Sequence, residues 1–225
     1  CRQYFRDKGK IFALFLQPLI IGFLFSQTFS KNSSLWIAAF ALILSANWFA
    51  LSLSIREIIQ EKNLFSSEIR KGVSPFGILF AKLFFISSIA FFQTLICFGF
   101  LNAVLSIAVS PLWLCVAFLS TILPATILGL LASCLVKNTS QANILLPLLI
   151  IPQVILGGAL VPIDQMTTIG RMLSALIPAK YNLDCLKNLF LNVSIHSQDL
   201  IVPIILACIF YIITWRLFSI LGKAK

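Results

Sequence analysis

Long apolar runs constrain the fold of this sequence more than any other feature. Residues 35–55, for example, contain no Asp, Glu, Lys or Arg. A helix rises about 1.5 Å per residue, so about 20 apolar residues cross the roughly 30 Å hydrocarbon core of a bilayer. The chain is 60% hydrophobic and 11% charged, whereas soluble domains carry about 25% charged residues. We therefore expect an all-α polytopic membrane protein, with residues 1–225 forming a single transmembrane domain.

The apolar runs predict six transmembrane helices. We place them at residues 11–29, 35–55, 76–105, 112–136, 144–160 and 200–221. The fifth run is short and contains Pro147, Pro152 and the pair Gly157-Gly158, which together predict a broken helix. Residues 1–10 are a basic lead-in that we expect to be a connecting helix. Residues 161–199 are expected to form an outer re-entrant helical segment, because irregular backbone at membrane depth must be covered by protein or line a cavity.

Lysine and arginine residues are distributed unevenly between the two sides of this topology. If residues 1–10 are cytoplasmic, 13 of the 17 basic residues lie on the cytoplasmic side, and Lys31, Arg171, Lys180 and Lys187 lie outside. Cytoplasmic loops of membrane proteins carry such an excess. We expect an integral protein of the plasma membrane or a bacterial inner membrane, with both termini cytoplasmic. The same bias explains the net charge of +10 without a nucleic-acid partner.

Cysteine spacing indicates neither a disulfide framework nor a metal site. Four of the six cysteines lie in apolar runs, where we interpret them as small apolar side chains. The sequence begins at Cys1 rather than at Met, so we expect a fragment or a processed chain.

The charged stretch 56–72 connects the second and third predicted spans and contains every glutamate of the chain. Steps of three and four residues place one set of side chains on a single helical stripe, namely Ile58, Glu61, Phe65, Glu68 and Gly72. On this face Glu68 can pair with Lys71. A charged amphipathic helix between two spans lies at the membrane interface. From the residues alone, it is either a solvated connector or a docking helix that receives force from a cytoplasmic partner.

Three patterns together resemble the membrane domain of type-2 ABC transporters, especially the G-subfamily of exporters. The first, Glu61-x-x-x-Phe65-x-x-Glu68-x-x-x-Gly72-x-Ser74, resembles the loop after the family's second membrane helix. The second, Pro152-Gln153…Gly158…Val161-Pro162…Pro178-x-x-Tyr181, is similar to the end of its fifth helix and its outer re-entrant segment. The third, Arg6-Asp7-Lys8…Gln17-Pro18-Leu19…Gly22, resembles its connecting helix and first span. Taken together, the resemblance covers nearly the whole chain.

The resemblance implies the permease domain of an ATP-driven exporter for a lipidic or amphipathic substrate. Residues 56–72 would be the coupling helix that touches an ABC nucleotide-binding domain, through Glu61, Phe65 and Glu68. A second copy of the membrane domain and membrane lipids would be the other partners. Helices two and five would line the substrate path, with Asn47, Trp48, Phe49, Gln153 and Ile155 as candidates. Helix packing is the more common role of such side chains.

ATP chemistry is not expected on this chain. It contains no Gly-x-x-x-x-Gly-Lys-Ser/Thr phosphate loop, so we expect it to be neither an enzyme nor the holder of a cofactor. ATP and Mg are expected on the nucleotide-binding domain, which would be fused upstream of Cys1 or carried by a separate chain.

Three other functions are compatible with a polytopic helical protein. An intramembrane enzyme needs ionisable groups gathered inside the bilayer, but His196 lies in the outer segment, and Lys82 and Arg216 lie near cytoplasmic helix ends, where they can snorkel. An ATP-independent channel or carrier is not favoured by a charge-free mid-membrane region. A non-transporting membrane scaffold would lack an ATPase partner.

Overall fold

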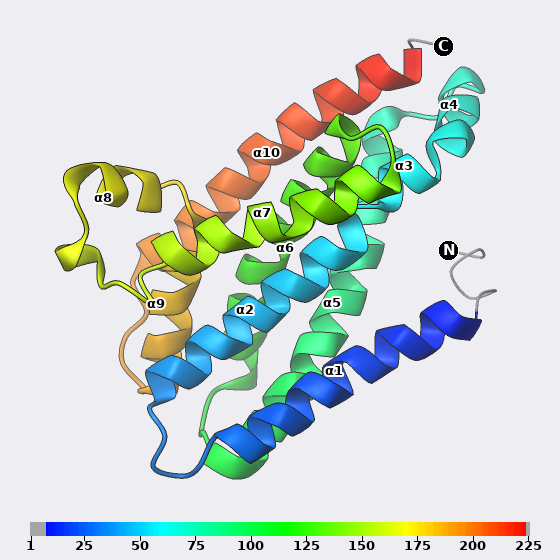
Figure 1. The fold of residues 1–225 in the computed structure, drawn as a ribbon. Coiled ribbons are helices and arrows are strands. Elements are labelled where there is room, and N and C mark those ends of the chain that lie inside the picture. The colour runs from blue at the N-terminus through cyan, green and yellow to red at the C-terminus, as the bar shows by residue number, and fades with distance from the viewer. Residues whose placement is uncertain (1–7, 224–225) are drawn as a thin grey trace.

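The computed structural model describes residues 8–223 as a bundle of helices without a strand in that range (Figure 1). Six long helices run between its two ends. They are α1 (Lys8–Thr28), α2 (Leu35–Ser54), α5 (Pro75–Leu105), α6 (Pro111–Leu135), α7 (Thr139–Leu156) and α10 (Ser197–Lys223). By length and hydropathy, five helices of the described range can span a membrane, and α1 adds the shorter apolar stretch Leu14–Thr28. The predicted all-α polytopic membrane fold is confirmed.

Two short helices lie at one end of the bundle, near the start of α1 and the end of α10 (Figure 1). These are α3 (Glu57–Gln60) and α4 (Lys62–Arg70), and we call this end the α3–α4 end. The predicted single helix over residues 56–72 is therefore wrong. Glu61, with φ −107° and ψ 17°, separates two helices, and Gly72 lies beyond α4 in the left-handed region at φ +91°.

The fifth long helix corrects another prediction. We expected a broken span over residues 144–160, but α7 runs without interruption from Thr139 to Leu156, with Pro147 and Pro152 inside it. Each proline removes one backbone donor, which costs the helix one hydrogen bond without ending it. The helix starts early because the Asn138 side chain accepts a hydrogen bond from the Gln141 N–H at 2.9 Å.

The segment after α7 forms the opposite end of the bundle, which we call the α8–α9 end (Figure 1). It contains the 3-10 turn η2 (Ile163–Gln165), α8 (Thr168–Ser174) and α9 (Pro178–Phe190). Helix α9 packs inward against α2, α6 and α10, whereas the apolar side chains of α8 are exposed. At the start of the chain, residues 1–7 of the predicted connecting helix lie outside the described residues, and residues 8–10 belong to α1.

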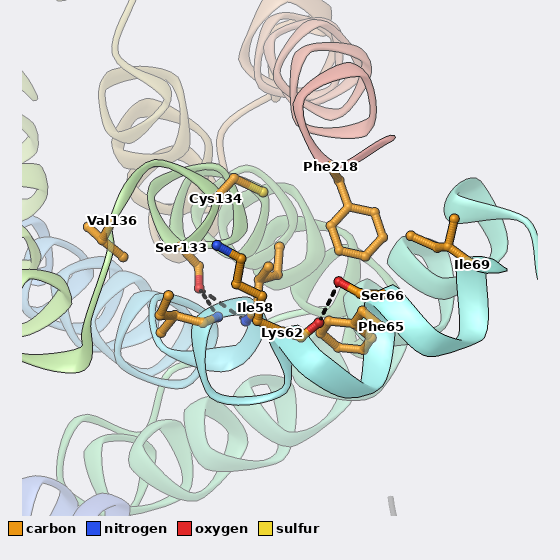
Figure 2. Close-up of a pocket in the computed structure, with 10 residues that line it drawn as sticks. Ile58, Lys62, Phe65, Ser66, Ile69, Ser133, Cys134, Val136 and Phe218 are labelled. Atoms are coloured by element: carbon orange, nitrogen blue, oxygen red, sulfur yellow. Dashed lines mark hydrogen bonds between the residues drawn. The ribbon is translucent and has the colours of Figure 1, made fainter. Parts of the chain in front are cut away.

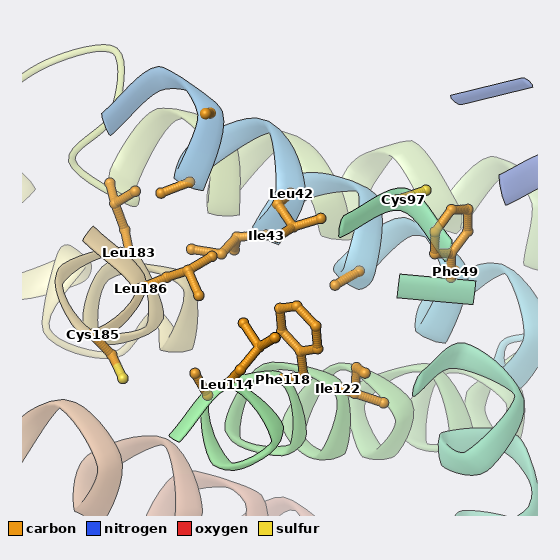
Figure 3. Packing of buried hydrophobic residues seen from close by; sticks show 14 of the residues in the cluster. Leu42, Ile43, Phe49, Cys97, Leu114, Phe118, Ile122, Leu183, Cys185 and Leu186 are labelled. Atoms are coloured by element: carbon orange, nitrogen blue, oxygen red, sulfur yellow. The ribbon is translucent and has the colours of Figure 1, made fainter. Parts of the chain in front are cut away.

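The main hydrophobic core lies between α2, α5, α6 and α9. Figure 3 shows Leu42 and Ile43 of α2 facing Phe118 of α6, with Leu183 and Leu186 of α9 beside them. Small residues allow α2 and α6 to approach closely, as is usual for helices in membranes. At Gly129 of α6, an added Cβ would lie 1.9 Å from the Ser54 Oγ. This contact holds the end of α2, and so the start of α3, against α6.

Candidate functional site

The charged residues 57–70 fold back onto the bundle as the two helices α3 and α4, which we call the α3–α4 elbow. At the end of α2, the Ile55 N–H still donates to the Leu51 carbonyl, and the chain then turns into α3. After α4, Ser74 caps α5 by accepting a hydrogen bond from the Gly77 N–H at 3.2 Å. The elbow is thus attached directly to the ends of two spans, α2 and α5.

Helix α6 holds the first turn of the elbow through one hydroxyl group. The Ser133 Oγ accepts hydrogen bonds from the backbone N–H groups of Ile58 at 3.0 Å and Ile59 at 3.2 Å (Figure 2). The first N–H groups of a helix have no partner within the helix. A side chain 75 residues further along the chain satisfies two of them, which fixes α3 to α6.

Helix α5 holds the elbow through a buried ion pair network. The Lys82 Nζ donates to the Glu57 carboxylate and, at 2.5 Å, to the Glu61 Oε2. The Glu57 side chain is 2% exposed, and those of Lys82 and Glu61 are 15% and 17% exposed. We expected Lys82 to lie near a cytoplasmic helix end, where it can snorkel, and the structure shows its ammonium paired with Glu57 and Glu61. Lys82 thus pairs with two carboxylates, and burying carboxylates without a positive partner would be costly.

Helix α10 holds the second half of the elbow through aromatic packing. Phe65 is buried at 4% exposure, and its ring packs edge-to-face on Phe218, with 5.5 Å between the ring centroids. The Lys82 Nζ lies 5.3 Å from the Phe65 centroid, within the range of a cation–π contact. Lys82 thus links the ion pairs of α3 to the aromatic contact of α4.

The structure brings two of the three predicted coupling residues together. Glu61 and Phe65 both contact Lys82, whereas Glu68 is half-buried on α4 and away from this network. The predicted side-chain pair between Glu68 and Lys71 is absent from the described residues. Lys71 already lies beyond α4, where its backbone N–H caps the helix and its side chain is exposed.

Four contributors to this site were not identified from the sequence, namely Glu57, Lys82, Ser133 and Phe218. Lys82 carried a usable signal, because a lysine inside an apolar span requires a partner, and the nearest acidic residues in sequence are in the stretch before that span. Ser133 and Phe218 carried none, since a small polar or an aromatic residue in a membrane helix has many possible neighbours.

The five predicted path residues do not form one lining within this chain. Phe49 is fully buried in the core. Asn47 and Gln153 are buried, and their amides donate to carbonyls of their own helices, at Ile43 and Leu149. Trp48 and Ile155 are exposed on the outer faces of α2 and α7, which pack against each other. Only these two residues are open to a substrate or to another chain.

Titratable groups at the α8–α9 end do not form a metal site. Among the described residues, no group of three or more His, Cys, Asp or Glu side chains can hold an ion. Burial raises the pKa of Asp184, and the positive charges of Lys187, Lys180 and His196 partly offset this rise. Burial, with Asp199 and Asp184 nearby, raises the pKa of the Cys185 thiol to about 12, so this thiol stays protonated at neutral pH.

The family of the chain follows from its similarity to a known protein family. A family model described as ABC-2 type transporter matches residues 1–191, which include the elbow and every helix from α1 to α9. The chain belongs to the ABC-2 type transporter family. A search of curated proteins found no match.

Membership confirms the predicted likeness to type-2 ABC permeases, without resolving the subfamily. As an ABC-2 type transporter, the chain is a membrane permease domain, and such domains are transport permeases rather than enzymes. Members of the family normally pair with an ATP-binding cassette domain. The apolar helices and the family together make this an integral membrane protein.

Proposed function

We propose that this ABC-2 type transporter chain is the permease domain of an ATP-driven exporter, in which the α3–α4 elbow transmits force from a nucleotide-binding domain to the bundle. One observation carries the proposal. Two short helices are fastened to three different long helices, through Lys82 on α5, Ser133 on α6 and Phe218 on α10. A connector that lies in solvent needs no contacts with the long helices, whereas a segment that transmits force to them does.

The proposal gives the predicted coupling residues different roles. Glu61 and Phe65 hold the elbow to the bundle, so a push on the elbow moves α5 and α10 with it. Gln60 and Leu64 are exposed and Glu68 is half-buried, which leaves them accessible to a cytoplasmic nucleotide-binding domain carrying ATP and Mg. Shifts of packed helices as near-rigid bodies are a common form of conformational switching.

The proposed substrate path lies between this chain and a second copy of it. Helix α7 supports this, because little of its surface is buried in the single chain. Ile144, Leu148, Ile151 and Ile155 form an exposed stripe on it at helical spacing. Trp48 on neighbouring α2 is also exposed. A path with such walls suits a lipidic or amphipathic substrate.

Coupling can be tested with the complete complex in proteoliposomes, by measuring ATP hydrolysis together with transport of fluorescent lipids and amphipathic dyes. In a Glu61→Gln variant we expect hydrolysis to continue and transport to fall by roughly fivefold or more, since typical coupling energies correspond to such factors. Arg171→Gln, at the opposite end of the bundle, is the matched control. Wild-type transport in both Glu61→Gln and Phe65→Ala, or equal flux without ATP, would refute the proposal.

A further inference from the structure

A shallow hollow lies between the elbow and the ends of α6 and α10 (Figure 2). Its walls are mainly apolar, with Ile69 of α4, Cys134 and Val136 at the end of α6, and Phe218 of α10. Two of its polar groups are already satisfied. The Ser133 Oγ accepts the two N–H groups of α3, and the Ser66 Oγ donates to the Lys62 carbonyl at 3.0 Å.

The ammonium of Lys62 is the polar group of the hollow that lacks a counter-charge. Lys62 is half-buried, and its side chain extends across the hollow towards α6 (Figure 2). Among the described residues, no carboxylate lies within 4.0 Å of its Nζ, because every ion pair found there belongs to Lys82. A half-buried ammonium over an apolar surface is a favourable place for an anion with an apolar tail.

The charges around the hollow favour the same kind of ligand. Glu57 and Glu61, the acidic residues closest in sequence, are bound to Lys82. The exposed charged side chains of the segment, Arg56, Arg70 and Lys71, are all basic, and half-buried Glu68 is the one other carboxylate of residues 56–71. Basic clusters at the membrane surface attract anionic lipid headgroups, with about 1 kcal/mol per Lys or Arg. The positive surroundings disfavour a headgroup that carries its own cation.

The hollow also adjoins a surface that lipid covers. Little of α10 is buried in the bundle, and Ile213 and Ile220, on either side of Phe218 in sequence, are exposed. With 3.6 residues per turn, these two side chains lie on the face of α10 that points away from Phe218. The hollow opens between α4, α6 and α10, and most of the surface of apolar α10 is unburied, so the surrounding membrane supplies the occupant.

We propose that this hollow binds one anionic phospholipid from the leaflet at the α3–α4 end. Its phosphate contacts Lys62, and its acyl chain packs against Ile69 and Phe218. A lipid bound there lies between α4 and α10 and so stiffens the elbow against the bundle. The site concerns the lipid surface of the chain and depends neither on ATP nor on the transported substrate.

Native mass spectrometry of the purified full chain, with added phosphatidylglycerol or phosphatidylcholine, tests the site. We expect the wild type to retain one phosphatidylglycerol molecule in preference to phosphatidylcholine. Lys62→Gln should weaken this binding by about five- to tenfold, and Lys62→Arg should preserve it. Lys137→Gln is the matched control, because Lys137 is an exposed lysine at the same end but outside the lining of the hollow.

A second variant tests the apolar hollow separately from the charge of Lys62. Ile69→Trp keeps Lys62 but fills the hollow, so it should also lower phosphatidylglycerol retention, while an unchanged thermal melt shows that the fold is intact. The proposal is overturned if Lys62→Gln retains lipid like the wild type, if Lys137→Gln loses as much as Lys62→Gln, or if phosphatidylcholine binds equally well.

Discussion

Lys82 is a charged residue about two turns inside the apolar helix α5, where an isolated ammonium is costly. Its pairing with Glu57 and Glu61 explains how a lysine and two carboxylates coexist at the edge of an apolar bundle. Glu57 lies on α3, Glu61 lies between α3 and α4, and Lys82 lies on α5, so the network forms only when the elbow folds back. The presence of the network therefore indicates that the elbow is folded back, and the network also stabilises that position of the elbow.

Replacing Lys82, the cation of this network, should show how much the network contributes to stability. We expect Lys82→Met to lower the free energy of unfolding by about 1–3 kcal/mol, less than for a fully buried pair because Lys82 and Glu61 are partly exposed. Thermal melts in detergent measure the change, with Lys137→Met as the control at an exposed site. Adding Glu61→Gln should recover part of the loss, since it removes a carboxylate that pairs with Lys82 in the wild type. A strictly additive double variant would contradict the ion pair.

The raised pKa of Asp184 on α9 predicts the direction in which stability changes with pH. Burial raises its pKa above the usual 3.8, although Lys187, Lys180 and His196 act in the opposite direction. The folded state therefore binds a proton more tightly than the unfolded state, and stability falls as the pH rises from 3.8 through the folded pKa. We expect Asp184→Asn to melt higher than the wild type at neutral pH and to lose this advantage below pH 3.8. Exposed Asp164, changed to Asn, is the control.

Sequence reasoning identified part of this site for a physical reason. Spacing placed Glu61 and Phe65 on one face of a local stretch, and the resemblance to type-2 ABC permeases implied their role in coupling. Their partners Lys82 and Phe218 belong to other helices further along the chain, and no local pattern encodes a contact between separate helices. The sequence also suggested that the face of Phe65 meets a partner chain, whereas the ring is buried against Phe218.

At the scale of single helices, α1 shows how a proline is accommodated inside a span. Pro18 has no N–H group, so the Leu14 carbonyl, four residues earlier, lacks its helical partner. The Gln93 Nε2 of α5 donates to this carbonyl at 2.8 Å, and one turn further the Cys97 thiol donates to the Pro18 carbonyl. The contact between α1 and α5 is therefore specified by polar groups within an apolar surface.

A double-variant cycle tests this arrangement. Gln93→Leu should lower the free energy of unfolding by about 1–3 kcal/mol, because it leaves the half-buried Leu14 carbonyl without a donor. In a Pro18→Ala background the same change should cost less, since the alanine supplies the backbone N–H that the proline lacks. Thermal melts of the four proteins give the coupling energy. Equal costs of Gln93→Leu in both backgrounds would contradict the assignment.

The contact between α2 and α6 predicts a different sensitivity. Gly129→Ala would place a Cβ 1.9 Å from the Ser54 Oγ, 2.9 Å from the Ser54 Cβ and 3.3 Å from the Ile55 backbone N, so Ser54 at the end of α2 must shift. We expect a loss of about 1–3 kcal/mol from this overpacking, and weaker transport because the start of α3 moves with Ser54. Gly99→Ala on α5 is the matched control, because its Cβ meets no atom within 4 Å. A melt equal to that of the control would contradict the close contact.

Helix boundaries were predictable where hydropathy alone sets them and less so elsewhere. The starts of α2 and α6 lie within one residue of the predicted spans, because charged or turn-forming residues bound them. The prediction of a broken span at α7 was wrong because the presence of a proline does not show whether the helix around it bends or ends. The elbow was expected as one helix, since spacing alone does not reveal that Glu61 leaves helical geometry to reach Lys82.

At the scale of the whole molecule, charge is divided between the two ends. All three glutamates and most described basic residues lie at the α3–α4 end, whereas Asp164, Asp184 and Asp199 lie at the α8–α9 end with Lys31, Arg171, Lys180 and Lys187 (Figure 1). The start of α1 and the end of α10 also lie at the α3–α4 end. This arrangement needs an even number of crossings, and the excess of basic residues favours a cytoplasmic α3–α4 end.

Side-specific labelling tests this topology and the function that depends on it. In a variant without native cysteines, a membrane-impermeant maleimide should label Lys71→Cys and Lys137→Cys from the cytoplasmic side, because α5 and α6 return the chain to the side it left. It should label Arg171→Cys from the opposite side, since α7 crosses once more. If Lys71→Cys reacts from the outside of sealed vesicles, a cytoplasmic ATPase cannot reach the elbow. The contacts of Lys82, Ser133 and Phe218 would then hold the elbow in place without transmitting force.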